Sequence, residues 1–158
     1  MAEITLTKFG EIQSTVLDKI LSLINECYAL LGEPMGGLVE LEIFEKSEEE
    51  IFFATHDALQ GKARIRVYVD KLLELPELVG LAGIRRQATH SILHGSLGFY
   101  FTTFPEELKR AINQYKLSYD FGNSLLYSIG MAAKEYEVTK FLYKNNFVEE
   151  QVAYAKYI

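Results

Sequence analysis

The strongest constraint on the fold is a change of apolar period along the chain. Between residues 11 and 31 apolar side chains recur at the helical spacing, whereas in 38–46 and 64–70 they alternate with polar ones, as in half-buried strands. A short apolar segment at 51–55 indicates a further strand, and the helical period then returns and continues to the C-terminus. One helix, a small sheet and a helical half predict an α+β fold.

Length and charge narrow the class of protein. The 158 residues suit a single domain spanning 1–158. A net charge of −6 argues against a general binder of nucleic acid or anionic membranes, and we expect the basic pair Arg85–Arg86 on a solvated face. The N-terminus lacks a secretory pattern and the apolar run at 78–84 is too short to cross a bilayer, so we expect a cytoplasmic protein. Cys27, the one cysteine, falls on the apolar stripe of the first helix, which favours a buried structural thiol.

Two histidines lie four residues apart in the sequence ATHSILHG, residues 88–95, on a helix predicted for 81–97. On a helix His90 and His94 differ by only about 40° around the axis, so both rings can reach one ion. A catalytic zinc site usually needs a third protein ligand as well. The same pair also fits two neutral histidines buried in a core, and this alternative stays open.

The segment HSILHG resembles the active-site helix of gluzincin-type zincin metallopeptidases, in which H-E-x-x-H on one helix is completed by a glutamate from a later helix. The resemblance implies a compact zincin-like fold and a zinc ion held by His90, His94 and such a glutamate. It also implies that strand 64–70 is the edge strand that borders the cleft. We choose Glu137 as the third ligand.

Two patterns in the later helix, predicted for about 122–145, bear on the choice of acid. Glu137 shares a helical stripe with Ile129, Ala133 and Phe141, which we expect to face inward, and a carboxylate there needs a partner. Glu135 is the alternative, because Thr139 follows it by one turn and could hydrogen-bond an imidazole.

The motif departs from the family pattern at its second position, where Ser91 replaces the glutamate that acts as general base. Loss of such a base typically costs about 10²–10⁴-fold in rate. The resemblance therefore implies a metallopeptidase-like domain that can bind zinc but lacks the usual peptidase activity, with no catalytic residue assigned. Two alternatives remain: an active metal-dependent hydrolase with a non-standard base, and a metal-free interaction module.

The third histidine, His56, and the aromatic segment 97–104 do not indicate a catalytic site. His56 precedes Asp57 in the segment 56–63, which we predict to be a loop, so a polar turn histidine is expected. Four aromatic residues in 97–104 favour core packing. A peptide or protein is the expected partner, neither nucleic acid nor a membrane is, and a homodimer stays open.

Overall fold

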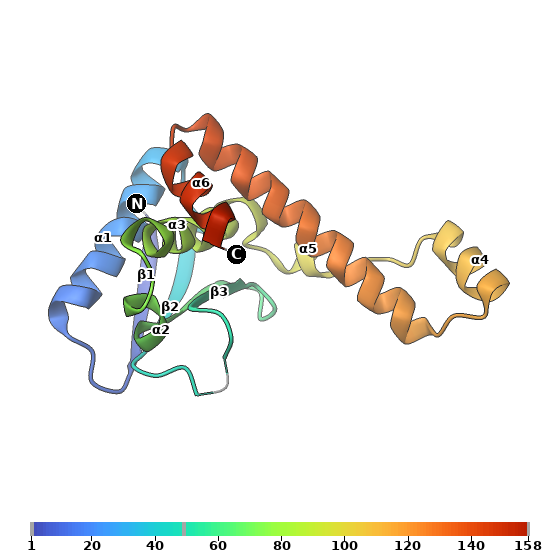
Figure 1. Ribbon diagram of the computed structural model, residues 1–158, viewed down its shortest axis with the longest axis horizontal. Coiled ribbons are helices and arrows are strands. Elements are labelled where there is room, and N and C mark those ends of the chain that lie inside the picture. The colour runs from blue at the N-terminus through green and yellow to red at the C-terminus, as the bar shows by residue number, and fades with distance from the viewer. Residues whose placement is uncertain (1, 49, 158) are drawn as a thin grey trace.

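The computed structural model describes residues 2–48 and 50–157 and confirms the α+β class (Figure 1). In chain order the elements are β1 (Glu3–Phe9), α1 (Ser14–Leu31), β2 (Leu38–Phe44), β3 (Ala54–Asp57), β4 (Ala63–Tyr68), α2 (Val69–Leu73), α3 (Glu77–His94), a 3-10 turn η1 (Leu97–Tyr100), α4 (Glu106–Tyr115), α5 (Tyr119–Lys144) and α6 (Val148–Tyr157).

The sheet has four strands in the order β1-β2-β4-β3. The first three are mutually parallel and β3 runs antiparallel to β4. β1 was not predicted, and the segment expected at 51–55 forms its strand at Ala54–Asp57 instead. The expectation that strand 64–70 is an edge strand is wrong, because β4 lies between β2 and β3 and the edge strand on that side is β3.

The two faces of the sheet differ sharply in character. On one face alternate residues of β2 and β4, such as Leu41 and Ile65, pack against Ile24 of α1 and Ile84 of α3 in one apolar core. α1 and α3 therefore cover the same face. The opposite face carries ion pairs between strands, from Arg64 to Glu40, Arg66 to Glu42 and Arg66 to Asp57. That face ends in a row of stacked rings, Phe9 on Phe44 and Phe44 on Tyr68, with centroids 4.3 and 5.1 Å apart.

Helix boundaries follow local signals. The first helix ends at Gly32, which takes φ of 117° and donates its N–H to Tyr28. Pro76 occupies the position before α3, where a missing N–H costs nothing, so α3 starts four residues earlier than predicted. No helix within the described residues is long and apolar enough to cross a membrane.

The long helix α5 is shared between two regions of the molecule (Figure 1). Its C-terminal part packs on the body through Val138 and Leu142, which are fully buried, and continues into α6. Its N-terminal part projects away from the body and carries α4 at its far end. α5 therefore brings acids from a late segment back across α3.

Candidate histidine cluster

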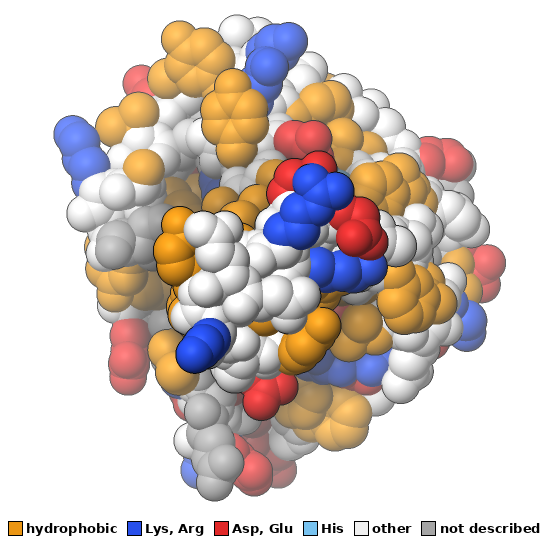
Figure 2. Space-filling view, turned by 90° about the vertical axis from the view of Figure 1, so that its right-hand side faces the viewer, with side chains coloured by type: hydrophobic (Ala, Val, Ile, Leu, Met, Phe, Trp, Pro, Cys, Tyr) orange, Lys and Arg blue, Asp and Glu red, His pale blue; other side chains and the backbone are white. Residues whose placement is uncertain are grey.

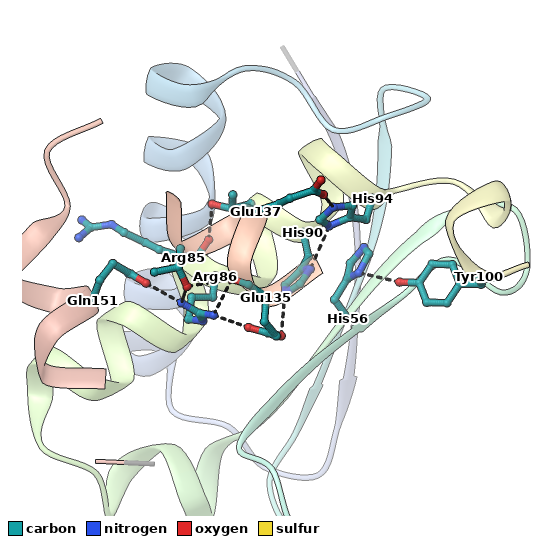
Figure 3. A network of polar contacts seen from close by, with 11 residues as sticks. His56, Arg85, Arg86, His90, His94, Tyr100, Glu135, Glu137 and Gln151 are labelled. Atoms are coloured by element: carbon teal, nitrogen blue, oxygen red, sulfur yellow. Dashed lines mark hydrogen bonds and ion pairs between the residues drawn. The ribbon is translucent and has the colours of Figure 1, made fainter. Parts of the chain in front are cut away.

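His90 and His94 lie in the last turns of α3, on the side that faces α5, and they are 5% and 1% exposed. Their Nδ1 atoms face each other at 3.3 Å. On the other side of each ring, Nε2 of His90 lies 3.0 Å from a carboxylate oxygen of Glu135, and Nε2 of His94 lies 2.8 Å from one of Glu137. Figure 3 shows these four side chains as a continuous row, carboxylate–imidazole–imidazole–carboxylate.

The two carboxylates constrain where the ring protons of this row can lie. A carboxylate can only accept, so each Nε2 must carry a hydrogen and donate it. Two neutral imidazoles then have no proton left, and two nitrogen lone pairs face each other across the 3.3 Å gap. A further proton or a cation between the two nitrogens would relieve the repulsion between these lone pairs.

The charge around the cluster favours such a cation. Burial raises the pKa of the Glu135 carboxyl, but hydrogen bonds and charge from His90 and Arg86 outweigh it and bring the pKa to about 2. Burial lowers the pKa of His94, whereas the hydrogen bond that its ring donates to Glu137 raises it. Glu135 is therefore a carboxylate at neutral pH, and protonating His94 alone is disfavoured by its burial.

Both acids considered from the sequence contact the histidine pair, one on each ring. The stripe assigned to Glu137 is nevertheless wrong, because Ile129 and Ala133 are exposed and the inward residues are Val138 and Leu142. Glu137 itself is exposed and reaches His94 from the edge of α5.

Thr139 does not contact either imidazole. Its hydroxyl donates to the carbonyl of Glu135 and accepts from Arg86. The hydrogen bond to a histidine that favoured Glu135 in the sequence is therefore not made, although Glu135 contacts His90 directly.

The basic pair preceding the histidines is buried, so its expected place on a solvated face is wrong. Arg86 contacts Glu135, Thr139 and, at 2.7 Å, Gln151 of α6. Arg85 bridges Glu26 of α1 and Glu150 of α6. These two guanidinium groups tie α3 to three other helices, and Arg86 also fixes the carboxylate that contacts His90.

Ser91 points away from the cluster. Its hydroxyl donates to the carbonyl of Ala88 and lies 2.8 Å from the Tyr28 hydroxyl of α1, and the side chain has no exposed surface. Burial is the main reason that the pKa of Tyr28 rises well above its usual value, so neither hydroxyl is a base near neutral pH. Position 91 is thus part of the contact between α1 and α3.

His56, expected in a loop, is part of β3 and pairs with Ile65 on the face of the sheet that α3 covers. Its ring lies beside that of His90, with centroids 5.8 Å apart, and Tyr100 places its hydroxyl 3.0 Å from Nδ1 (Figure 3). Its Nε2 is buried without a partner. Burial, followed by the nearby His90 and His94, lowers the pKa of His56 to about 3, which keeps the ring neutral.

The cluster fits a metal ion in part. Two nitrogens bound to one tetrahedral zinc at about 2.0–2.1 Å are separated by about 3.3 Å, the distance between the two Nδ1 atoms. Glu137, however, lies on the Nε2 side of His94, away from that gap. Among residues 2–48 and 50–157 no three His, Cys, Asp or Glu side chains stand in an arrangement that could hold a metal ion.

Comparisons with known proteins add nothing to this geometry: no family model, no curated protein and no solved structure matches the chain.

Proposed function

We propose that this protein is a zincin-like domain that binds zinc at the histidine pair and does not hydrolyse peptides by the usual zincin route. The observation that carries the proposal is the 3.3 Å separation of two Nδ1 atoms whose partner nitrogens each donate to a carboxylate. Imidazoles backed by carboxylates in this way are typical of zinc sites, since the outer hydrogen bond orients the ring and raises its basicity.

The loss of peptidase activity is supported by Ser91. The residue that would replace the general base is buried against Tyr28 and faces the core rather than the histidine nitrogens. Glu135, which could serve as a substitute base, is held by His90 and by Arg86. A hydrolase with a different base is the runner-up, and it would need a free carboxylate near the ion.

A role in binding a peptide or protein fits the exposed apolar side chains of α4 and α5. Tyr115, Phe121 and Tyr127 are each more than half exposed. Figure 2, which faces this end of the molecule, shows hydrophobic side chains spread between charged ones. A metal-free interaction module, including a homodimer, is the second alternative. The cytoplasmic location that we propose is consistent with a single, unpaired cysteine.

Metal content tests the proposal. Full-length protein purified without chelator should contain close to one equivalent of zinc, and His94→Ala should contain almost none. Glu107→Gln, a change at an exposed position on α4, should retain the metal. Zinc at about 100 times its Kd should stabilise the parent protein by about 2.7 kcal/mol and leave His94→Ala unchanged.

Two results would contradict the proposal and favour one of the two alternative functions. Folded parent protein that neither contains nor binds zinc would favour the interaction module. Zinc-dependent peptide cleavage by the parent protein would favour the hydrolase.

A further inference from the structure

A cavity of about 890 Å³ shares Glu135 with the histidine cluster and is otherwise lined by different residues. It is bounded by the segment that precedes β3, by the region of α2, by Arg86 of α3, and by residues of α5 and α6. Small-molecule sites in proteins typically have volumes of about 300–1,000 Å³. The space is therefore large enough for an organic molecule with several rings.

Most of the cavity wall is apolar. It includes the aromatic side chains of Phe52, Phe53, Tyr136 and Tyr157, together with Met131. Phe52, Tyr136 and Tyr157 are each more than half exposed, so they lie on the side of the cavity that is open to solvent. A bound apolar molecule would remove this surface from water, which is favourable in proportion to the area covered. The wall thus complements a ligand with apolar rings.

The formal charges of the wall cancel. They are two cations, Lys71 and Arg86, and two carboxylates, Glu74 and Glu135. Arg86 is almost fully buried and contacts the Glu135 carboxylate, as Figure 3 shows, and Lys71 contacts a backbone carbonyl. A charged ligand would have to break the Arg86–Glu135 pair or remain unpaired in a partly buried place, and both are costly. These contacts therefore favour a neutral ligand.

Tyr154 of α6 supplies a polar group that can orient such a ligand. The guanidinium carbon of Arg86 lies 4.8 Å from the centroid of the Tyr154 ring, which helps to hold this ring in place. Within the described part of the chain, the Tyr154 hydroxyl makes no hydrogen bond. Burial raises the pKa of this hydroxyl, against the nearby charge of Arg86, so the group stays protonated and can donate to an acceptor.

We propose that this cavity binds a neutral aromatic molecule, whose rings lie against Phe52, Tyr136 and Tyr157 and whose carbonyl or ring nitrogen accepts a hydrogen bond from the Tyr154 hydroxyl. These four residues are distinct from the groups that contact the histidine pair. The inference therefore does not depend on zinc.

A neutral dye tests the cavity directly. Nile red is aromatic, carries a carbonyl group and becomes more fluorescent in apolar surroundings. It is titrated into the full-length protein in the presence of chelator, with folding of each variant checked by circular dichroism. We expect saturable binding of one dye per chain, which Phe52→Ser weakens by more than about tenfold because the buried contact of one ring is lost. Phe101→Ser, a matched change at an exposed phenylalanine outside the cavity, should leave the Kd within about twofold.

Two further measurements test the chemistry of the ligand. Tyr154→Phe, which removes only the hydroxyl, should weaken binding of Nile red by about 2–10-fold, the usual worth of one hydrogen bond. An unchanged Kd would overturn the role of this hydroxyl. The anionic dye anilinonaphthalene sulfonate should not displace Nile red, and displacement would overturn the assignment of a neutral ligand.

The whole inference would be overturned by folded parent protein that shows no saturable binding of Nile red. Equal Kd values for the parent and Phe52→Ser would also overturn it. Because chelator is present throughout, neither result bears on zinc binding, and the metal content tests the proposed function separately.

Discussion

The body of the molecule and the arm formed by residues 106–130 use similar apolar side chains in opposite ways. In the body, Leu41, Ile65 and Ile84 are almost fully buried between the sheet and two helices. In the arm, Ile112 is the buried apolar residue of α4, whereas Tyr127 and Ile129 are mostly exposed. The free energy of folding is therefore concentrated in the body.

The histidine cluster lies where these two regions meet. α3 belongs to the body, and its contacts with α1 and the sheet fix the two rings. The carboxylates come from α5 just beside Val138 and Leu142, the residues by which that helix docks on the body. Substitutions in the body should thus disturb the cluster indirectly, while those in the arm should leave it intact.

The largest effect is expected at Ser91. Ser91→Glu places a carboxylate in a fully buried position beside Tyr28, and an uncompensated buried charge costs about 3–5 kcal/mol. Urea denaturation should show this loss, without any gain of peptidase activity. Ser91→Ala, the matched control, should lose about 1–3 kcal/mol because Tyr28 loses its partner. A stable Ser91→Glu protein would place position 91 outside the core.

A matched isoleucine pair measures the difference between body and arm directly. Ile65→Ala removes a fully buried side chain of β4 and should cost about 2–5 kcal/mol. Ile129→Ala removes an exposed one from α5 and should change the free energy of unfolding by less than about 0.5 kcal/mol. Equal losses at the two positions would mean that the exposed face of α5 is covered in solution.

Two glycines of α5 sharpen the comparison within the arm. A Cβ on Gly122 would lie 2.4 Å from Ile112 and 2.5 Å from Phe104, so Gly122→Ala should destabilise the packing of α4 by about 1–3 kcal/mol. A Cβ on Gly130 would meet nothing within 4 Å, and Gly130→Ala should stabilise the helix by about 0.5–1 kcal/mol. Hydrogen exchange of α4 amides checks the first change and thermal unfolding the second.

The smallest effect on the free energy of unfolding is expected from a change of pH, through Glu135 where α5 meets the body. The pKa of Glu135 is lowered to about 2 from an unfolded value near 4.5, so its contribution to stability is complete above pH 4.5 and is lost as the pH falls toward 2. Because this carboxylate is partly exposed, we expect less than about 1 kcal/mol. The stability difference between the parent and Glu135→Gln should narrow across that interval, and a difference that stayed constant would contradict this assignment.

Much of the fold was predictable from local patterns. The period of two in 38–46 and 64–70 located β2 and β4, and the helical period located the helices. The sequence of β1, EITLTKF, also alternates at Ile4 and Leu6, but the stretch is short and Phe9 does not continue the alternation. It is held by pairing with β2, a long-range interaction that a local pattern does not record.

The candidate site was predictable only in part. The helical spacing correctly placed His90 and His94 on one side of α3, and both acids reach them. His56 was missed because β3 was placed at 51–55, which left this residue in the following loop. A strand shifted to 54–57 would have turned His56 toward α3. How α5 crosses α3, and hence which acid meets which ring, depends on the docking of Val138 and Leu142, which no spacing specifies.

The row of rings on the polar side of the sheet has a consequence for strand alignment. Phe9, Phe44 and Tyr68 are direct register partners at the last rung of three parallel strands. A slip of one residue in any of these strands would separate its ring from the row and turn its core residues toward water. The stacking of the three aromatic side chains therefore favours a single register of the three parallel strands. The same register fixes which side chains of the neighbouring strand face the histidine helix.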